Sequence, residues 1–348
     1  MQHNYILLKK VILIIKNLHV KHFKTVNDLD IECSRVNVFI GEPNTGKTNI
    51  LESIGFLSWL EHNTISLNSF HLNDFVRHGN LYNLFYNNEF DKPFEIGYDN
   101  DAITVSWDSN NLSIDKKGGP KIGISTGSMI NFTINPPSYH PGPFKFYKFK
   151  DFNKQTFTSL AYIVTDYLLP PNGANMITLL QTNKGARNLF SNYIKNINLK
   201  LVINQQNKTI EFQKEIEDAI HINFPIETLS DTMLRIISHM IAIESNKNSV
   251  ITFDEPESYA FPYYTKVLAE MIALDKTNQF FVTTHNPYVF YSILEKVPKK
   301  EGSIFITYLE KDKDTTKVKK LSENDIDKLY DENGVMGMDV FFNLNKFM

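Results

Sequence analysis

The sequence predicts an α/β fold with a parallel core sheet flanked by helices, an antiparallel side sheet and a helical insert. A G-x-x-x-x-G-K-T loop over Gly41–Thr48 lies between a strand-like run and a helix-like run. Residues 11–40 and 94–134 have strand-like patterns. From Leu229 onward strand-like and helix-like segments alternate, which is typical of parallel strands joined by crossover helices.

The composition is that of a globular chain with room for one large domain or two fused lobes. The chain has 348 residues, 42% of them hydrophobic, and a net charge of −3, so any nucleic-acid binding needs a local basic patch. Cys33 is the single cysteine, which excludes an intrachain disulfide and leads us to expect a reducing, cytoplasmic location. The apolar stretch at residues 5–15 contains two lysines and is too short to span a bilayer, so we predict a strand rather than a signal peptide.

Local periodicity predicts the elements in order. We expect two or three strands over 11–40, a helix after the loop, an antiparallel sheet over 94–134, mostly helix over 155–220, alternating helix and strand from 229, and a charged hairpin or solvated face at 310–320. Prolines between 136 and 143 mark a loop. We therefore divide a single domain, 1–348, into an N-terminal lobe (1–135), a mostly helical insert (136–228) and a C-terminal lobe (229–348).

The loop has the residue types that hold nucleotide phosphates. Gly41 and Gly46 let the backbone turn so that successive N–H groups face the phosphates. Lys47 adds a positive charge, and Thr48 offers a hydroxyl to Mg²⁺. A chance match in a surface loop would not explain why a strand precedes the motif and a helix follows it. We therefore predict a nucleotide site.

Two later strands end in polar residues. The strand-like run Val250–Phe253 is followed by Asp254, which can hold Mg²⁺, and by Glu255, which is a candidate general base. Phe280–Thr284 ends at His285, which could hydrogen-bond a γ-phosphate. Alternatively, the two acids only cap the end of a strand, and the histidine is an ordinary surface residue. The phosphate-binding loop in the same chain favours the functional interpretation.

A capped helix precedes the Asp-Glu strand. Ser230 and Asp231 are good N-cap residues before a helix with apolar residues at helical spacing. Taken alone, this pattern also fits an ordinary core helix. The order of loop, Leu-Ser-Asp helix, Asp-Glu strand and His strand is not that of GTPases or kinases.

The order of these motifs along the chain resembles that of the stand-alone ABC-type ATPases related to RecF, the SMC proteins and the overcoming-lysogenization-defect (OLD) group. The similar segments are LHVKHFKTVNDLDIE, NVFIGEPNTGKTNILESIGFL, LSDTMLR, FDEPESYAFP and TTHNP. They cover roughly residues 14–60 and 225–310. The resemblance implies a P-loop NTPase fold of the ABC ATPase type, with ATP and Mg²⁺ as cofactors.

The resemblance also implies roles for individual residues. The nucleotide-binding set is Gly41, Asn44, Thr45, Gly46, Lys47, Thr48 and Asn49. The metal ligands are Thr48 and Asp254, and the catalytic residues are Glu255, which activates water, and His285. The residues Ser230, Asp231 and Arg235 would contact the nucleotide held by a second subunit, which implies a homodimer formed through ATP.

Three departures from the family pattern lead us to expect slow hydrolysis. Thr232 stands where the family has a glycine that lets the backbone approach the γ-phosphate. The segment SYAFP replaces the usual Leu-His before Pro262. No glutamine can be assigned as the additional residue that helps to hold Mg²⁺, and Gln155 is a poor candidate.

The remaining features narrow the function to two classes. We expect no membrane span, no nuclease-like acidic cluster after residue 310 and no long coiled coil, which argues against a transporter subunit, an OLD nuclease and an SMC arm. One possibility is an ATPase whose dimer acts in DNA repair or in defence against foreign DNA. The other is an ATP-gated switch that signals to an effector protein. The stretch Phe144–Lys154 interleaves lysines with aromatic residues, and we favour an edge strand with outward lysines over a DNA contact.

Overall fold

The computed structural model describes residues 14–65, 70–108, 111–116, 122–125, 130–131, 142–149, 166–218, 220–258, 260–310 and 313–331. Most of the stretch predicted as an N-terminal strand lies outside these residues. The first described strand begins at Asn17.

A six-stranded sheet forms the centre of the fold, in the order β16-β15-β3-β14-β13-β9. The five strands from β15 to β9 are parallel, and β16 pairs with β15 in the antiparallel sense. The strands are β3 (Val36–Gly41), β9 (Phe144–Tyr147), β13 (Val250–Asp254), β14 (Gln279–Thr283), β15 (Gly302–Glu310) and β16 (Thr315–Lys320). The parallel core sheet is confirmed. Of the two alternatives for 310–320, a charged hairpin or a solvated face, the antiparallel pairing of β15 and β16 supports the hairpin.

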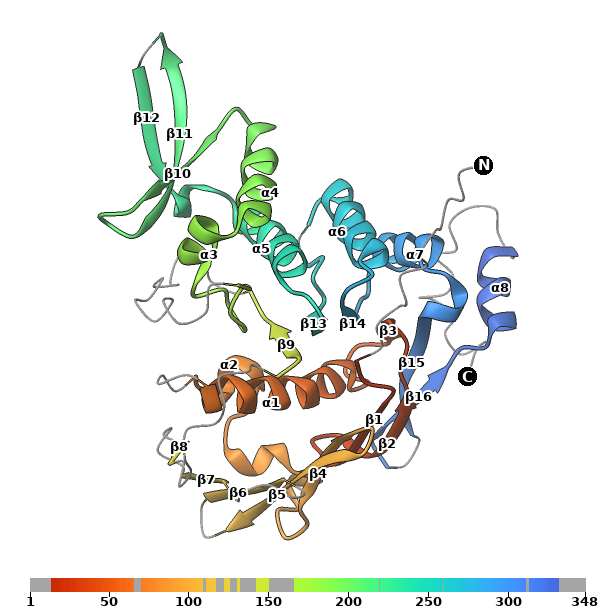
Figure 1. The fold of residues 1–348 in the computed structure, drawn as a ribbon. Helices are drawn as coiled ribbons and strands as arrows, with labels where there is room; N and C mark the ends of the chain where they lie inside the picture. Colours follow the sequence, from red (N-terminus) through yellow and green to blue (C-terminus); the bar gives the residue numbers. More distant parts are fainter. Residues whose placement is uncertain are drawn as a thin grey trace, which may run out of the picture.

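Helices cover both faces of this sheet. Figure 1 shows α5, α6 and α7 on one side of the core strands and α1 on the other. The alternation along β3 separates the two layers, because Val38 and Ile40 face the cluster under α5–α7 while Phe39 faces the cluster around α1. The helices are α1 (Lys47–Ile65), α2 (Leu72–Phe75), α5 (Asp231–Ser245), α6 (Pro262–Leu274), α7 (Pro287–Lys296) and α8 (Glu323–Asp331). No helix in the described ranges is long and apolar enough to cross a membrane.

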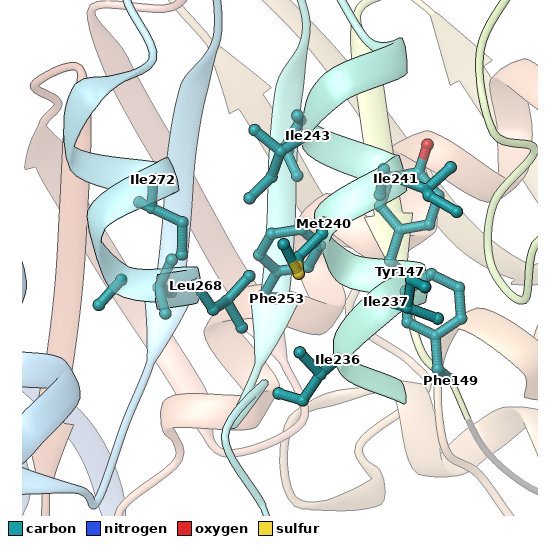
Figure 2. Close-up of a cluster of buried hydrophobic side chains, with 14 of the residues drawn as sticks. Tyr147, Phe149, Ile236, Ile237, Met240, Ile241, Ile243, Phe253, Leu268 and Ile272 are labelled. Atoms are coloured by element: carbon teal, nitrogen blue, oxygen red, sulfur yellow. The ribbon is translucent and has the colours of Figure 1, made fainter. Parts of the chain in front are cut away.

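Packing between α5 and the sheet fixes the position of the helix that starts at Asp231. Figure 2 shows Ile236, Ile237 and Met240 of α5 in one cluster with Phe253 of β13 and Tyr147 of β9. Each of these side chains is less than 10% exposed. Burial of a large apolar side chain contributes about 1.5–3 kcal/mol, so this contact holds α5 firmly on the sheet.

A seven-stranded antiparallel sheet lies beside the core, in the order β2-β1-β4-β5-β6-β7-β8. Its strands are β1 (Asn17–Phe23), β2 (Val26–Glu32), β4 (Phe94–Tyr98), β5 (Asp101–Asp108), β6 (Asn111–Lys116), β7 (Ile122–Ser125) and β8 (Ile130–Asn131). The predicted antiparallel side sheet is therefore confirmed. Its first two strands come from residues 11–40, and the third strand of that segment, β3, belongs to the core.

The prediction of a mostly helical insert over 136–228 was wrong for residues 200–225. Two helices, α3 (Met176–Thr182) and α4 (Lys184–Lys195), are followed by an antiparallel sheet of β10 (Lys200–Asn204), β11 (Thr209–Glu217) and β12 (Ile220–Pro225). Ile210 and Phe212 are buried while their neighbours are at least partly exposed, which is the period of a strand. Figure 1 shows this sheet projecting away from the core. A 3₁₀ turn, Ile226–Thr228, joins it to α5.

The lysine–aromatic stretch forms an edge strand in part. Among the described strands β9 pairs only with β13, at the end of the core sheet, so the edge strand predicted there is confirmed for Phe144–Tyr147. The outward position predicted for Lys145 was wrong, because this residue is 2% exposed. Its Nζ donates to the carbonyl of Gly142 at 2.6 Å and lies over the Tyr167 ring. Lys150 and Lys154 lie outside the described residues.

Candidate nucleotide site

Three neighbouring parallel strands end at one edge of the core sheet. β14 lies between β3 and β13, and the register pairs Thr283 with both Phe39 and Asp254. Because the three strands run in the same direction, the residues that follow them meet at their carboxyl ends. The phosphate-binding loop, the Asp254–Glu255 pair and His285 are therefore brought together.

The loop between β3 and α1 is a tight turn that needs glycine at residue 46. Gly46 has φ +90°, and a Cβ atom there would lie 1.9 Å from Thr316 Oγ1. Asn44 also has a left-handed conformation, with φ 63°. These turns carry the chain from the end of β3 into the first turn of α1, where unpaired N–H groups and the helix dipole favour an anion.

Lys47 lies against its own loop. Its Nζ donates to the carbonyls of Gly41 at 2.9 Å and Glu42 at 2.7 Å. Burial lowers the pKa of Lys47 to about 8, and the negative charges of Glu255 and Asp254 limit the fall. Lys47 therefore bonds to the loop carbonyls and feels the negative charges of Asp254, at the end of β13, and Glu255, which follows it.

Thr48 and Asp254 form the part of the site that fits a metal ion. Thr48 Oγ1 donates to Asp254 Oδ1 at 3.1 Å, and Thr283 Oγ1 donates to the same oxygen at 2.7 Å. Neighbouring oxygens around an octahedral Mg²⁺ at about 2.1 Å are about 3 Å apart, so the hydroxyl and the carboxylate have a suitable spacing. Burial raises the pKa of Asp254, against hydrogen bonds from Thr283 and Thr48. Across the described ranges no cluster of three or more His, Cys, Asp or Glu could hold a metal, so Mg²⁺ would also need waters or phosphates.

Glu255 and His285 form a pair across two strand ends. Glu255 Oε1 lies 3.0 Å from His285 Nε2, and both side chains are more than a third exposed. Glu255 has φ +46°, and its N–H donates to Thr283 Oγ1 at 3.0 Å. The hydrogen bond with His285 lowers the pKa of Glu255, so this carboxylate is ionised at neutral pH.

Two members of the predicted nucleotide-binding set have side chains engaged elsewhere. Thr45 Oγ1 donates to the Glu42 carbonyl and lies 3.0 Å from Thr307 Oγ1 of β15. The amide of Asn49 donates to Thr25 Oγ1, at the turn between β1 and β2. These side chains fasten the loop and α1 to the rest of the fold.

The Leu-Ser-Asp segment forms the N-terminal end of α5, and this end is accessible to solvent. Ser230 is the N-cap of α5, and its Oγ accepts from the Met233 N–H at 3.4 Å. Ser230 and Asp231 are exposed, whereas Thr232 and Arg235 are half-buried. Among the described residues no hydrogen bond joins Ser230 or Asp231 to the phosphate-binding loop.

Two residues near the site were missed by the sequence analysis. Glu257 is buried and accepts hydrogen bonds from Thr284 and from the His285 N–H. Arg77, whose Nε donates to the buried Glu52 of α1, exerts a positive potential that partly offsets the rise in the pKa of Asp254. Glu257 could have been suspected from the Asp-Glu-Pro-Glu run, but no signal in the sequence singles out Arg77.

A short part of the chain is similar to curated proteins. A 45-residue stretch is 51% identical to the DNA replication and repair protein RecF of Streptococcus suis strain 05ZYH33, and RecF of strain 98HAH33 matches equally. Each match covers 13% of this chain and 12% of the RecF chain, so the chain corresponds to a small part of these relatives.

Solved structures show the fold. A crystal structure of an Smc head bound to the C-winged helix domain of ScpA has a TM-score of 0.53 at 15% identity, covering 90% of this chain and 99% of the other. An Smc head domain with an extended coiled coil, bound to the C-terminal domain of ScpA and derived from Pyrococcus furiosus, has a TM-score of 0.53 at 13% identity, covering 91% and 98%. The predicted ABC-type ATPase fold is therefore confirmed as that of an SMC head.

A family model described as "AAA domain, putative AbiEii toxin, Type IV TA system" matches residues 36–290. This range includes the phosphate-binding loop, the Leu-Ser-Asp helix and the ends of β13 and β14. The chain belongs to this family of P-loop ATPases.

Proposed function

We propose that this chain binds ATP with Mg²⁺ at the loop between β3 and α1 and hydrolyses it slowly. The observation that carries the proposal is the meeting of three strand ends, where Thr48 from the loop bonds to Asp254 and Glu255 pairs with His285. The family match supports nucleotide binding.

The loop would hold the phosphates through its backbone N–H groups and Lys47. The cation now bonds to two loop carbonyls, and phosphate oxygens are stronger acceptors for it. Gly41, Asn44, Gly46 and the backbone of Thr45 shape the turn, while Asn49 anchors α1. Mg²⁺, held by Thr48 and Asp254, would neutralise charge on the phosphates.

In this proposal Glu255 would activate the attacking water and His285 would orient it. The ionised carboxylate can accept a proton, a role that contributes about 10²–10⁴ in rate. Its lowered pKa also makes it a weak base, because a general base works best with a pKa near the working pH. This supports slow hydrolysis.

The exposed start of α5 supports an ATP-sandwich homodimer. The Ser230 hydroxyl would contact the γ-phosphate held by a second copy, where the helix N-terminus attracts negative charge, and Asp231 and Arg235 would belong to the same signature segment. Thr232 adds a side chain at this contact and would weaken it.

We infer that the dimer acts in a DNA-related process, either repair or defence against foreign DNA. The support is the short RecF match and the SMC-head fold. The second candidate is an ATP-gated switch that signals to a partner protein. Burial of Lys145 favours this alternative, because it removes one lysine of the Phe144–Lys154 stretch from contact with DNA.

Light scattering on a Glu255→Gln variant tests the assembly. With Mg²⁺ and ATP the variant should form a dimer, because binding survives while water activation fails, and adding Ser230→Arg should return it to monomer with ATP affinity nearly unchanged. A Glu255→Gln protein that stays monomeric at saturating ATP contradicts the composite site. Turnover stimulated by DNA favours the DNA-acting ATPase, whereas slow turnover that ignores DNA favours the switch.

A further inference from the structure

Glu257, which lies three residues after β13, bonds to the two residues that directly follow β14. Its side chain is 6% exposed. Glu257 Oε1 accepts from Thr284 Oγ1 at 2.5 Å and from the His285 N–H at 3.3 Å. One carboxylate oxygen therefore holds two successive residues of the segment that carries the His285 ring.

The network continues past His285 into the next helix. Thr284 Oγ1 accepts from the Asn286 N–H at 2.9 Å, and Asn286 Oδ1 accepts from the Tyr288 N–H at 2.8 Å to cap α7. The backbone of residues 284–286 is thus fixed by Glu257 before His285 and by the α7 cap after it. The position of the His285 ring depends on this backbone path.

The neighbouring Glu255 is held by a separate contact. Its N–H donates to Thr283 Oγ1 at 3.0 Å, so β13 and β14 are tied twice, once in each direction. The side chains of Glu255 and His285 then meet at 3.0 Å. Loss of the Glu257 tie would leave Glu255 in place and free only the histidine side of the pair.

A purely structural role explains Glu257 poorly. Its Oε2 is buried and has no hydrogen-bond partner within the described part of the chain, an arrangement that costs about 1–3 kcal/mol. Burial raises the pKa of Glu257 to about 7, so the ionised form is disfavoured at this position. An apolar residue would fill the space at lower cost but could accept neither hydrogen bond.

We propose that Glu257 is a positioning residue that holds His285 against Glu255 by accepting hydrogen bonds from Thr284 and the His285 backbone. The inference rests on the proposed ATPase function. Glu257 touches no residue of the phosphate-binding loop in these contacts, so it should affect the chemical step and not nucleotide affinity. Misplacement of a catalytic group by about 1 Å can cost about 10² in rate.

Single-turnover hydrolysis and fluorescent-ATP affinity, measured on the full chain, test this role. Glu257→Ala should lower the hydrolysis rate by about 10²-fold and leave ATP affinity within about threefold. Glu257→Gln keeps an oxygen at the Oε1 position and should stay within about fivefold of the wild-type rate. If the negative charge of Glu257 were what mattered, this neutral variant would be as slow as Glu257→Ala. Glu270→Ala, on the partly exposed face of α6, is the matched control and should leave both quantities unchanged.

The outcomes separate this inference from the proposed function. A wild-type chain with no ATP turnover contradicts the proposed function, and the role of Glu257 falls with it. If the wild type is active, a folded Glu257→Ala variant with wild-type rate refutes the positioning role alone, as does a Glu257→Gln variant as slow as Glu257→Ala. Should Glu257→Ala fail to fold, Glu257→Met decides, because it fills the space with an apolar side chain and accepts neither hydrogen bond. Reduced rate with unchanged affinity in Glu257→Met supports the role, and full activity overturns it.

Discussion

Replacement of Glu255 by glutamine should separate ATP binding from hydrolysis. The substitution keeps the length of the side chain, and the amide oxygen can still accept a hydrogen bond at the 3.0 Å position of His285 Nε2. The backbone turn, with its N–H bonded to Thr283, is unaffected. What is lost is the ability to take a proton from water.

The size of the effect follows from that single loss. General-base catalysis contributes about 10²–10⁴ in rate, which corresponds to about 3–5 kcal/mol in the activation free energy. ATP affinity should stay within about threefold, because Glu255 is one of three carboxylates that act on Lys47 and two remain. The expected signature is therefore a large fall in turnover with little change in binding.

Phosphate release in single turnover, with protein in excess over ATP, measures the chemical step directly. Glu295→Gln is the matched control, because this α7 carboxylate has a side chain 65% exposed. A Glu255→Gln protein that is folded and hydrolyses ATP within about fivefold of the wild-type rate would refute the assignment of the base.

Three further experiments test the packing of the fold. His239 is fully buried, and desolvation lowers its pKa to about 3, so protonation of this histidine favours the unfolded chain below pH 6.5. The unfolding free energy of His239→Phe should therefore rise by about 2 kcal/mol relative to that of the wild type between pH 6.5 and pH 5, measured by urea denaturation. A difference between the two proteins that does not change with pH would contradict this. Burial raises the pKa of Cys33 to about 12, so its thiol should react with a thiol reagent only after denaturation, and rapid labelling of the native chain would contradict its burial. Lys145→Met leaves the buried Glu61 without its neighbouring charge and should destabilise the chain by about 3–5 kcal/mol, whereas a surface lysine would cost almost nothing.

The core of the fold could be predicted because its strands are buried on both faces. Runs such as Val36–Ile40 and Phe280–Thr283 are apolar or fully buried, and polar site residues follow directly at their ends. The local sequence is therefore enough to predict both the buried strands and the place of the candidate site at their ends. The antiparallel side sheet was equally visible, because its strands alternate and are separated by turn residues.

Other features depend on contacts between distant residues. The alternating pattern of the Phe144–Lys154 stretch predicted an outward position for Lys145. The residue is buried, beside the carboxylate of Glu61, which lies 84 positions earlier near the end of α1. Glu257 finds its partners 27 and 28 residues later. The β10–β12 sheet carries charged and amide residues on β11 that also suit a helix, and only its pairing resolves the choice.

Slow hydrolysis has two possible origins in this chain, and they predict different behaviour. If the lowered pKa of Glu255 limits the rate, the weak base acts within one site and specific activity should not change with protein concentration. If Thr232 limits the rate by weakening contact between two copies, specific activity should rise with protein concentration, because hydrolysis is then second order at low concentration. Thr232→Gly distinguishes the two, since removal of the side chain should tighten the dimer and raise turnover only in the second case. Turnover that is independent of concentration and unchanged by Thr232→Gly would place the limit at Glu255, and a partner other than a second copy would then be needed to complete the site.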